Sequence, residues 1–357
     1  MNENRYLIQL KKDKYYSEAL KKLVVNPKSM SRDEKTFILS TAILFLKVYI
    51  KDKRNRTFFD LAYYIILKYS VSFNDYRPLY DISVNAGFFP IAQVILKNGF
   101  IEESPIFDTV RSSVIARKYT TIDNITETLE QKLFSDGILN AIEKNISYIA
   151  PTSFGKSKLI ISHIKKLINE TKNELKCGII VPSKSLLQQT YFDIKKEKLP
   201  IKLIIHDEMY NNDSSFVAIF TQERALRLLE RNDISFDILY IDEAHNIFER
   251  DSRAVLLSRL IKFNRLRNQN SKVLYFSPLV STSENLLVEA DTSIFERKIS
   301  LNMKEPELYL FQKDNLLGKY NRFLDELYPI KEYGNIFHFI FSSLSEKNFF
   351  YIAVPRK

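Results

Sequence analysis

The sequence predicts a protein of the α/β class, in which an all-α N-terminal domain precedes a parallel sheet with helices on both faces. Apolar residues recur at helical spacing through residues 1–115. From residue 146 onward, short apolar strands alternate with amphipathic helices, a pattern typical of a parallel sheet. The chain has 357 residues, of which 45% are hydrophobic, so two domains can each bury a core.

The N-terminal domain, residues 1–115, is expected to consist of antiparallel helix pairs and to serve as a helical-repeat or partner-docking module. Ser31–Glu34 has the capping-box pattern that opens a helix. The helices that we expect cover 17–24, 34–50, 58–69, 77–86 and 89–98. Residues 100–125 contain many β-branched side chains and few helix signals, so we expect a connector there and place the boundary segment at 116–127.

The second domain, residues 128–300, is predicted to contain the parallel sheet. The expected strands are 147–150, 178–181, 202–206, 216–221, 238–241 and 272–277. The expected helices are 156–169, 184–196, 222–231 and 253–265, and a helix near 125–144 leads into the domain. Sheets of this kind bind ligands at the carboxyl ends of their strands.

A candidate phosphate-binding loop, residues 150–157, lies between an expected strand and an expected helix and reads Ala-Pro-Thr-Ser-Phe-Gly-Lys-Ser. Backbone N–H groups at a helix N-terminus bind phosphates, because the helix dipole favours anions. Gly155 lets the backbone approach the phosphates, while Lys156 is placed to reach the β- and γ-phosphates and Ser157 to ligate Mg²⁺. The first position is Ala150 rather than glycine, so the usual pattern is broken. The residues expected to bind ATP are Thr152, Ser153, Phe154, Gly155, Lys156 and Ser157.

An acidic motif, Asp-Glu-Ala-His at residues 242–245, follows the apolar strand 238–241. Asp242 is placed to hold Mg²⁺, and Glu243 is placed to orient or activate the attacking water. We therefore name Glu243, Asp242 and Lys156 as candidate catalytic residues. The candidate Mg²⁺ ligands are Ser157 and Asp242.

Three further segments occur in an informative order. Residues 179–189 and 220–226 each follow an expected strand, and residues 275–279 end another. Together with the two motifs above, they resemble the DExH branch of superfamily 2 helicases over about 128–300. In that family the first two segments contact the nucleic-acid backbone, although here Gln222 replaces a proline. The third lies where the family has Ser-Ala-Thr, and only Ser277 matches.

The resemblance implies a RecA-like P-loop NTPase domain that uses ATP and Mg²⁺. It assigns backbone contacts to Pro182, Ser183, Lys184, Thr221, Gln222 and Glu223. It assigns coupling of the nucleotide site to motor movement to His245 and Ser277. Gln131 lies at the distance expected of an adenine-reading glutamine, but its surroundings match that motif poorly. The implied partner is nucleic acid, for which we favour DNA over RNA.

The phosphate-loop sequence is similar to that of superkiller-like helicases, including those of bacterial antiphage defence such as the Hachiman system. In that case the helical domain would dock a partner nuclease or effector. Residues 301–357 are expected to form an inter-domain connection and, at 348–355, the opening strand of a second, incomplete RecA-like domain. We therefore expect a truncated helicase, in which the isolated chain binds ATP but hydrolyses it very slowly without an arginine finger.

Two other functions stay open on these residues. One is a duplex-DNA translocase that does not separate strands, as in restriction systems. The other is a module that binds ATP without hydrolysing it and recruits an effector. A strand-displacement assay beside a triplex-displacement assay distinguishes the translocase from a helicase. A Glu243→Ala variant with full cellular activity would favour the module that does not hydrolyse ATP.

The composition fits these expectations. The net charge of +10 suits a polyanionic partner, since each neutralised phosphate releases counterions. The single cysteine, Cys177, excludes a disulfide framework and is expected to be a packed thiol. The N-terminus has no secretory apolar core, and the longest apolar run, 37–46, is shorter than the ~20 residues of a membrane span. We therefore expect a cytoplasmic protein without membrane contact.

Overall fold

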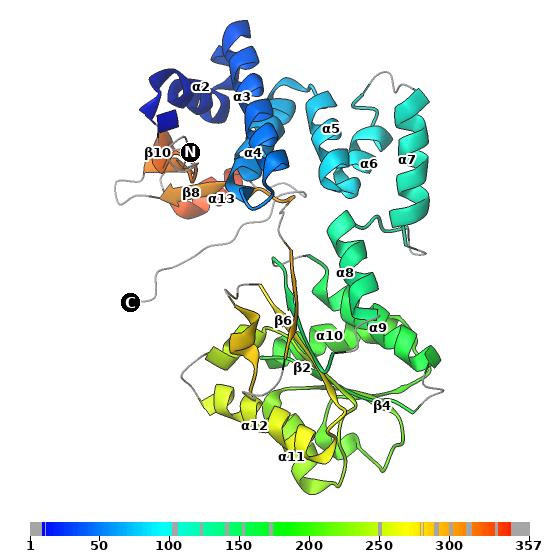
Figure 1. The fold of residues 1–357 in the computed structure, drawn as a ribbon. Coiled ribbons are helices and arrows are strands. Elements are labelled where there is room, and N and C mark those ends of the chain that lie inside the picture. Colours follow the sequence, from blue (N-terminus) through cyan, green and yellow to red (C-terminus); the bar gives the residue numbers. More distant parts are fainter. Residues whose placement is uncertain are drawn as a thin grey trace. The chain divides into compact units, whose positions relative to one another are not determined.

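The computed structural model divides into two compact units, one formed by residues 1–126 with 301–357 and the other by residues 127–300 (Figure 1). The residues whose structure is described are 9–10, 12–101, 106–121, 124–139, 143–151, 154–170, 174–248, 252–278, 280, 282–288, 293–299, 303–311, 316–332 and 335–343. Each unit has a core of its own.

The N-terminal part of the first unit is all-α, as predicted. Its helices are α2 (Lys14–Val25), η1 (Pro27–Ser29), α3 (Arg32–Lys51), α4 (Arg56–Phe73), α5 (Arg77–Ala86), α6 (Phe89–Lys97) and α7 (Ile106–Tyr119). The predicted capping box is present, because Ser31 accepts from the Glu34 backbone N–H and Glu34 accepts from that of Ser31. Aromatic side chains fill the core, where Phe59 meets Phe88 edge-on with ring centroids 6.0 Å apart.

Helix α7 corrects the expected connector over 100–125. The β-branched residues of this segment lower its helix propensity, but tertiary contacts override such preferences. Arg77 Nη1 on α5 donates to Asp108 Oδ2 at 2.6 Å, and Ile115 is buried. The prediction of a connector was wrong because these contacts cannot be read from local propensity.

The C-terminal segment of the first unit forms a small antiparallel sheet. Its elements are β8 (Leu308–Phe311), β9 (Leu316–Asn321), β10 (Glu326–Glu332) and α13 (Ile336–Ser343), with strand order β10-β9-β8. Tyr328 on β10 is buried in the helical core, and the Tyr63 hydroxyl donates to the Met303 carbonyl at 2.7 Å. The sequence predicts an inter-domain connection over 301–357, whereas this sheet packs on the N-terminal helices. The expected strand at 348–355 lies outside the described residues.

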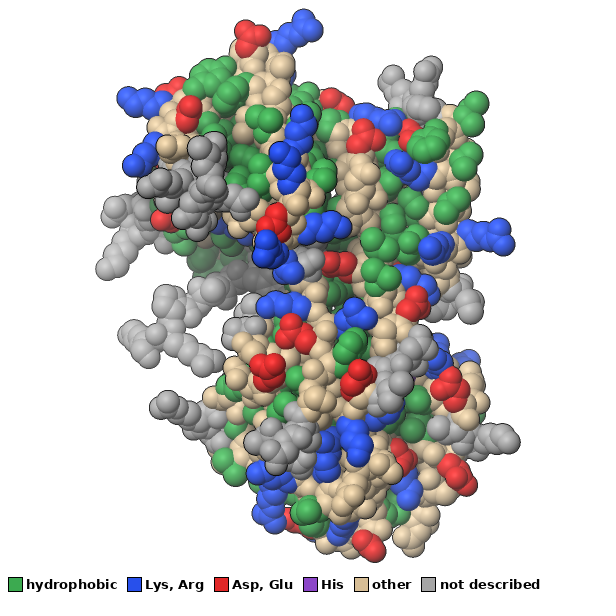
Figure 2. Space-filling view, viewed as in Figure 1, with side chains coloured by type: hydrophobic (Ala, Val, Ile, Leu, Met, Phe, Trp, Pro, Cys, Tyr) green, Lys and Arg blue, Asp and Glu red, His purple; other side chains and the backbone are tan. Residues whose placement is uncertain are grey.

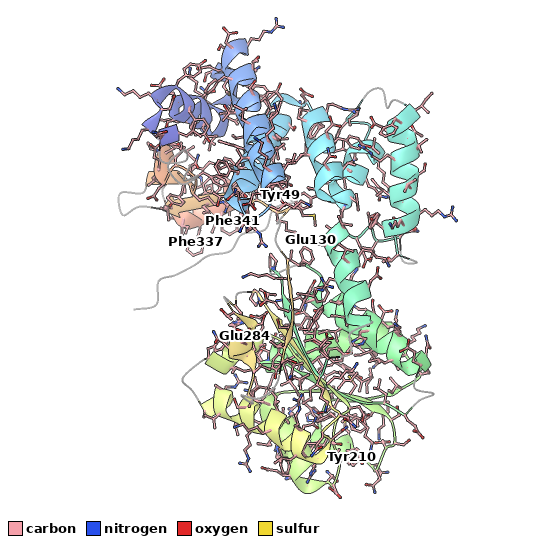
Figure 3. All side chains as sticks on the ribbon, in the orientation of Figure 1. Tyr49, Glu130, Tyr210, Glu284, Phe337 and Phe341 are labelled. Atoms are coloured by element: carbon pink, nitrogen blue, oxygen red, sulfur yellow. The ribbon has the colours of Figure 1, made fainter. Side chains whose placement is uncertain are left out.

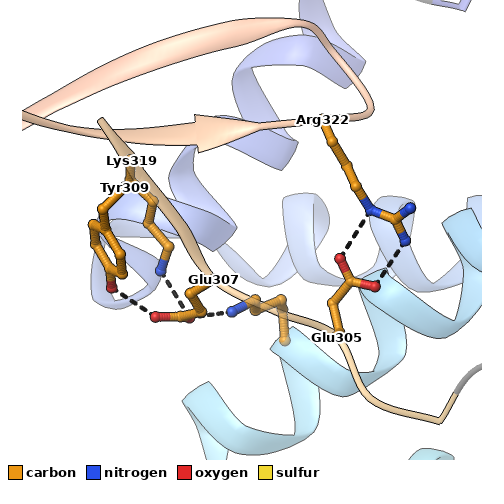
Figure 4. A network of polar contacts seen from close by, with 6 residues as sticks. Glu305, Glu307, Tyr309, Lys319 and Arg322 are labelled. Atoms are coloured by element: carbon orange, nitrogen blue, oxygen red, sulfur yellow. Dashed lines mark hydrogen bonds and ion pairs between the residues drawn. The ribbon is translucent and has the colours of Figure 1, made fainter. Parts of the chain in front are cut away.

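A polar network ties this sheet to α4 (Figure 4). Glu307 accepts hydrogen bonds from Lys68, from Lys319 Nζ at 2.9 Å and from the Tyr309 hydroxyl at 2.6 Å. Burial alone would raise the pKa of Glu307, but Lys68, Tyr309 and Lys319 together lower this pKa to about 2. The network therefore holds the charged Glu307 carboxylate where the C-terminal sheet meets α4, two segments that are far apart in sequence.

The surface of the protein mixes charge and apolar side chains. On the face shown in Figure 2, lysine and arginine side chains are interspersed with aspartate and glutamate. Phe337 and Phe341 lie one turn apart on α13 and are 60% and 70% exposed (Figure 3). Among the described residues, no helix has both the length and the apolar character needed to cross a bilayer.

The second unit contains a seven-stranded parallel sheet, with strand order β3-β4-β2-β5-β6-β1-β7. Its strands are β1 (Asn145–Ile149), β2 (Lys176–Ile180), β3 (Lys202–Ile204), β4 (Phe216–Phe220), β5 (Ile238–Ile241), β6 (Lys272–Ser277) and β7 (Phe295–Lys298). All strands except β7 were predicted to within a few residues. Strand β7 was missed because its residues Phe-Glu-Arg-Lys, mostly exposed, carry no apolar pattern.

Helices cover both faces of this sheet, as predicted (Figure 1). The helices are α8 (Leu129–Leu139), α9 (Lys156–Glu170), α10 (Lys184–Lys196), α11 (Gln222–Arg231) and α12 (Ser252–Arg267), with short turns η2 (Asp207–Met209), η3 (Ala244–Phe248) and η4 (Ser283–Leu286). Apolar residues of α8, α9 and α10 form one core cluster, and those of α11 and α12 form another. Because β6 separates β1 from β5, the predicted loops after these strands lie near each other at one sheet edge.

Candidate nucleotide and nucleic-acid site

The predicted phosphate loop connects β1 to the N-terminus of α9. Gly155 has a φ of 90°, a left-handed conformation that glycine adopts without a Cβ clash. Gly155 and Ser157 are exposed, whereas the Phe154 side chain is buried in the core beneath the loop. Only backbone atoms of Phe154 therefore remain for a ligand. Thr152 and Ser153 lie outside the described residues.

Gln131 on α8 supports this loop. Its Nε2 donates to the Phe154 carbonyl at 2.7 Å. Its Oε1 accepts from the Thr128 backbone N–H at 2.7 Å, and the Thr128 hydroxyl accepts from the Gln131 backbone N–H at 3.1 Å. This is a capping box, and the pattern Thr-x-x-Gln at 128–131 is the sequence signal that would have found it. The structure thus joins Gln131 to the phosphate loop, while adenine reading stays a prediction.

Lys156 connects the phosphate loop to the acidic motif. The residue is 9% exposed, and its Nζ has no hydrogen-bond partner among the described residues. Glu243 Oε1 lies 3.8 Å from Lys156 Nζ, which is an ion-pair distance. A buried ammonium with unused donors is the arrangement expected at a site that receives an anion, because burial without partners costs free energy.

The acidic motif forms a tight turn at the end of β5. Glu243 has a φ of 51°, a strained conformation for a residue other than glycine, and its backbone N–H bonds to Asp242 Oδ1 at 3.0 Å. Burial, together with the negative charge of Glu243, raises the pKa of Asp242, while Lys156 acts in the opposite direction. A carboxylate whose ionised form is disfavoured in this way is suited to a cation, which would stabilise its charge.

A hydrogen bond in the core fixes the two motifs relative to each other. His163 on α9 and Tyr240 on β5 are both buried, and His163 Nδ1 lies 2.8 Å from the Tyr240 hydroxyl. Burial, with smaller contributions from nearby lysines, lowers the pKa of His163 to about 4, so the ring is neutral at pH 7. The helix that begins at Lys156 is thereby held against the strand that ends at the acidic motif.

The two residues predicted to couple the site to movement lie side by side. His245 Nδ1 is 3.4 Å from Glu243 Oε2 and 3.4 Å from Ser277 Oγ. Ser277 ends β6, the strand between β1 and β5, and is fully buried. The structure brings these residues together, and their coupling role stays a prediction.

The predicted backbone-contact segments lie beside each other at a second opening. A pocket of about 460 Å³, here called the outer pocket, is formed by Pro182, Ser183, Lys184, Thr221, Glu223, Arg224, Arg227 and Arg253. Ser183 caps α10 by accepting from the Leu186 backbone N–H at 3.2 Å, and Thr221 precedes α11. Two helix N-termini and four basic side chains therefore converge on a single pocket that contains one carboxylate, which favours phosphate.

Burial separates these residues into two groups. Ser183 and Lys184 are exposed, and Glu223 is partly exposed. Thr221 and Gln222 are each 6% exposed. Gln222 instead lines a smaller, partly open cavity of about 30 Å³, here called the inner cavity, whose walls are Ile180, Val181, Pro182, Gln222, Ile241, Asp242, Glu243, Asn246, Arg253 and Leu257. The Gln222 side chain is thus buried and borders the same cavity as the acidic motif.

The sequence analysis missed the arginines of the outer pocket. Arg224 Nη1 donates to the Ile205 carbonyl at 2.8 Å, and Arg227 Nε lies 3.7 Å from Asp207 Oδ2. Arg253, at the start of α12, belongs to no motif. Arg224 lies within the predicted segment 220–226 but was assigned no role. For Arg227 and Arg253, the sequence signal is the basic composition of their helices, which many exposed helices share.

The described residues fit a magnesium–nucleoside triphosphate. Asp242 and Ser157 offer the oxygen ligands that Mg²⁺ prefers. The Lys156 ammonium, which has no hydrogen-bond partner among the described residues, suits a phosphate. The α9 N-terminus adds backbone N–H groups.

Part of the second unit is similar to a known protein family. Residues 129–293, slightly less than half of the chain, match the family model described as DEAD/DEAH box helicase. One similar solved structure is described as DEAD-box helicase Mss116 bound to ssRNA and UDP-BeF, with 18% sequence identity and a TM-score of 0.45. The similarity covers 56% of this chain and 46% of that one, so less than half of that chain's length is matched. No curated protein sequence matches this chain significantly.

Proposed function

We propose that residues 127–300 are the ATP-binding half of a nucleic-acid helicase or translocase. The observation that carries this proposal is the buried Lys156 ammonium, which has no hydrogen-bond partner among the described residues and lies 3.8 Å from Glu243 Oε1. The γ-phosphate of ATP would give Lys156 the acceptor that it lacks. Glu243 would then be free to orient a water molecule for attack.

Each residue of the site has a distinct part in this proposal. Asp242 and Ser157 would hold Mg²⁺, which supplies charge neutralisation on the phosphates when it is bound. The loop around Gly155 would donate backbone hydrogen bonds to the phosphates, while Gln131 holds the loop through its bond to the Phe154 carbonyl. His245 would report the state of Glu243 to Ser277.

The outer pocket supports nucleic acid as the polymer on which the motor acts. Phosphate contacts through helix N-termini and basic side chains carry no base information, which suits a protein that moves along any sequence. Single-stranded DNA and RNA of the same sequence should be compared, because our expectation of DNA rests on the family resemblance alone. The antiphage role, the partner protein and the cytoplasmic location likewise stay predictions from resemblance and composition.

Binding and single-turnover measurements test the proposal. We expect the wild-type chain to bind ATP in the presence of Mg²⁺ and to bind single-stranded oligonucleotides. Glu243→Gln should retain ATP binding and lose slow hydrolysis, because the amide cannot activate water. Absence of ATP binding by the wild-type chain would refute the proposal. Binding of both ligands with equal, undetectable hydrolysis in both proteins would favour the non-hydrolysing module.

A further inference from the structure

Arg253 lies at the start of α12 and joins both loops of the outer pocket. Its Nη2 donates to the Pro182 carbonyl at 2.5 Å, and its Nε donates to Glu223 Oε1 at 3.2 Å. Pro182 belongs to the β2–α10 loop, and Glu223 belongs to the first turn of α11. One side chain therefore links three segments that are distant in sequence.

Arg253 also belongs to the walls of both pockets. It lines the outer pocket and the inner cavity, and Asp242 and Glu243 line the inner cavity too. The inner cavity has room for a water molecule beside polar side chains. A change in the position of Arg253 would therefore alter the walls of both the outer pocket and the inner cavity.

Two packed routes lead from Arg253 to the carboxylates. Pro182 follows the end of β2, where the Ile180 carbonyl accepts the Asp242 backbone N–H at 2.9 Å. In addition, α12 packs on η3, the turn that directly follows Glu243. The acidic motif is therefore held on one side by the strand that leads to Pro182 and on the other by the helix that carries Arg253.

The present partner of Arg253 is easily exchanged. The side chains of Arg253 and Glu223 are 45% and 39% exposed, and ion pairs at such exposure are weak. A phosphate competes well for a guanidinium, because it can accept two parallel hydrogen bonds. Burial raises the pKa of Glu223, but a hydrogen bond from Thr221 and the nearby Arg253 lower it, and the net effect is a lowered pKa. Glu223 is therefore charged at pH 7 and repels a phosphate that enters the outer pocket.

We propose that Arg253 is a positioning residue that couples nucleic-acid binding to ATP binding. A backbone phosphate in the outer pocket replaces Glu223 as the acceptor of Arg253, and the resulting shift of α12 and the β2–α10 loop reaches the Asp242–Glu243 turn. This inference rests on the proposed function. It adds a residue and a route that no motif indicates.

The experiment uses the full 357-residue chain and three variants. Arg253→Gln removes the positive charge and the paired N–H donors of the guanidinium. Glu223→Gln removes the negative charge that competes with phosphate. Arg259→Gln is the matched control, because Arg259 makes a similar ion pair from α12 to Glu230 on α11, at 2.7 Å, away from both cavities. Affinity for a fluorescent ATP analogue is measured with and without a saturating single-stranded oligonucleotide, and oligonucleotide affinity is measured at several salt concentrations.

The wild type and Arg259→Gln should bind the ATP analogue roughly 5- to 150-fold more tightly with oligonucleotide than without it. In Arg253→Gln, the oligonucleotide should change the affinity for the ATP analogue by less than about twofold. In Arg253→Gln the slope of log affinity against log salt should be smaller by about 0.7, the loss of one phosphate contact. Glu223→Gln should bind the oligonucleotide up to roughly fivefold more tightly than wild type.

Three outcomes would overturn the inference. Arg253→Gln could behave like Arg259→Gln, or the wild type could bind both ligands while its affinity for the ATP analogue is the same with and without oligonucleotide. Glu223→Gln could also weaken oligonucleotide binding as much as Arg253→Gln does, which would rule out the exchange of acceptors. Each of these leaves the proposed function standing. Absence of oligonucleotide binding by the wild type would instead overturn the proposed function and, with it, the coupling.

Discussion

Replacement of Lys156 by methionine should separate the function of this side chain from its effect on stability. Methionine keeps the volume of the lysine stem, so it opens no large cavity. The ammonium is buried, and its Nζ has no hydrogen-bond partner among the described residues. Leaving a buried charged donor unsatisfied costs about 1–3 kcal/mol or more. The variant removes this cost.

The opposing contribution is the attraction to Glu243. At 3.8 Å, and with an effective dielectric constant of about 20, this attraction is worth roughly 4 kcal/mol before desolvation. Much of it is offset by the burial of Lys156, and Glu243 itself is 28% exposed, so water can solvate the carboxylate that remains. We therefore expect Lys156→Met to be neutral, or more stable by up to about 1 kcal/mol, in the absence of nucleotide.

Thermal unfolding without nucleotide and ATP binding by titration measure the two effects. One kcal/mol corresponds to a rise of about 2–4 °C in melting temperature for a domain of this size. ATP affinity should fall by about 100-fold, since a charged hydrogen bond to phosphate is worth up to roughly 3 kcal/mol. Lys158→Met, at an exposed position of the same helix, is the control and should change neither quantity. A loss of more than about 2 kcal/mol in Lys156→Met would refute the reasoning and make Lys156 a structural residue.

Three further predictions concern pH, the polar network and the thiol. The folded-state pKa of Asp242 is raised, so its ionised form destabilises the fold. Asp242→Asn should therefore raise the melting temperature at pH 7. This gain should shrink as the pH falls through the folded-state pKa, because the wild-type carboxyl then becomes neutral as well. Glu307→Gln leaves Lys68 and Lys319 without their shared carboxylate and should cost roughly 1–2 kcal/mol in urea unfolding. Since the pKa of Glu307 is depressed, that cost should be full above pH 4.5 and vanish as the pH falls to about 2; a pH-independent cost would contradict the assignment. Burial raises the pKa of the Cys177 thiol, so a thiol reagent should modify it only on unfolding, and rapid modification of the native protein would show otherwise.

Much of the second unit could be predicted from local patterns. Strand β5 is a run of apolar residues followed by Asp242, and a run of this kind between turn signals indicates a buried strand whatever surrounds it. The phosphate loop is similarly local, since Gly155 and Lys156 are neighbours and the helix begins at Lys156. Parallel strands align their carboxyl ends at one edge, so motifs at those ends converge without further information.

Other features depended on contacts between distant residues. The connector expected over 100–125 is helix α7, because Asp108 pairs with Arg77 and Ile115 is buried. The sheet of residues 303–332 packs on the N-terminal helices through Tyr328, and no local signal predicts that partner. Propensity describes only neighbours along the chain, whereas burial depends on what the rest of the fold places nearby.

The sequence by itself determined that this protein carries a phosphate loop and an acidic motif on a parallel sheet, because both motifs are short and lie at strand ends. The tertiary structure decided how these motifs are supported and connected. Arg253 contacts Pro182 and Glu223 across sequence separations of 71 and 30 residues. Such contacts follow from the packing of α12 against the sheet and α11, which brings these three segments within hydrogen-bonding distance.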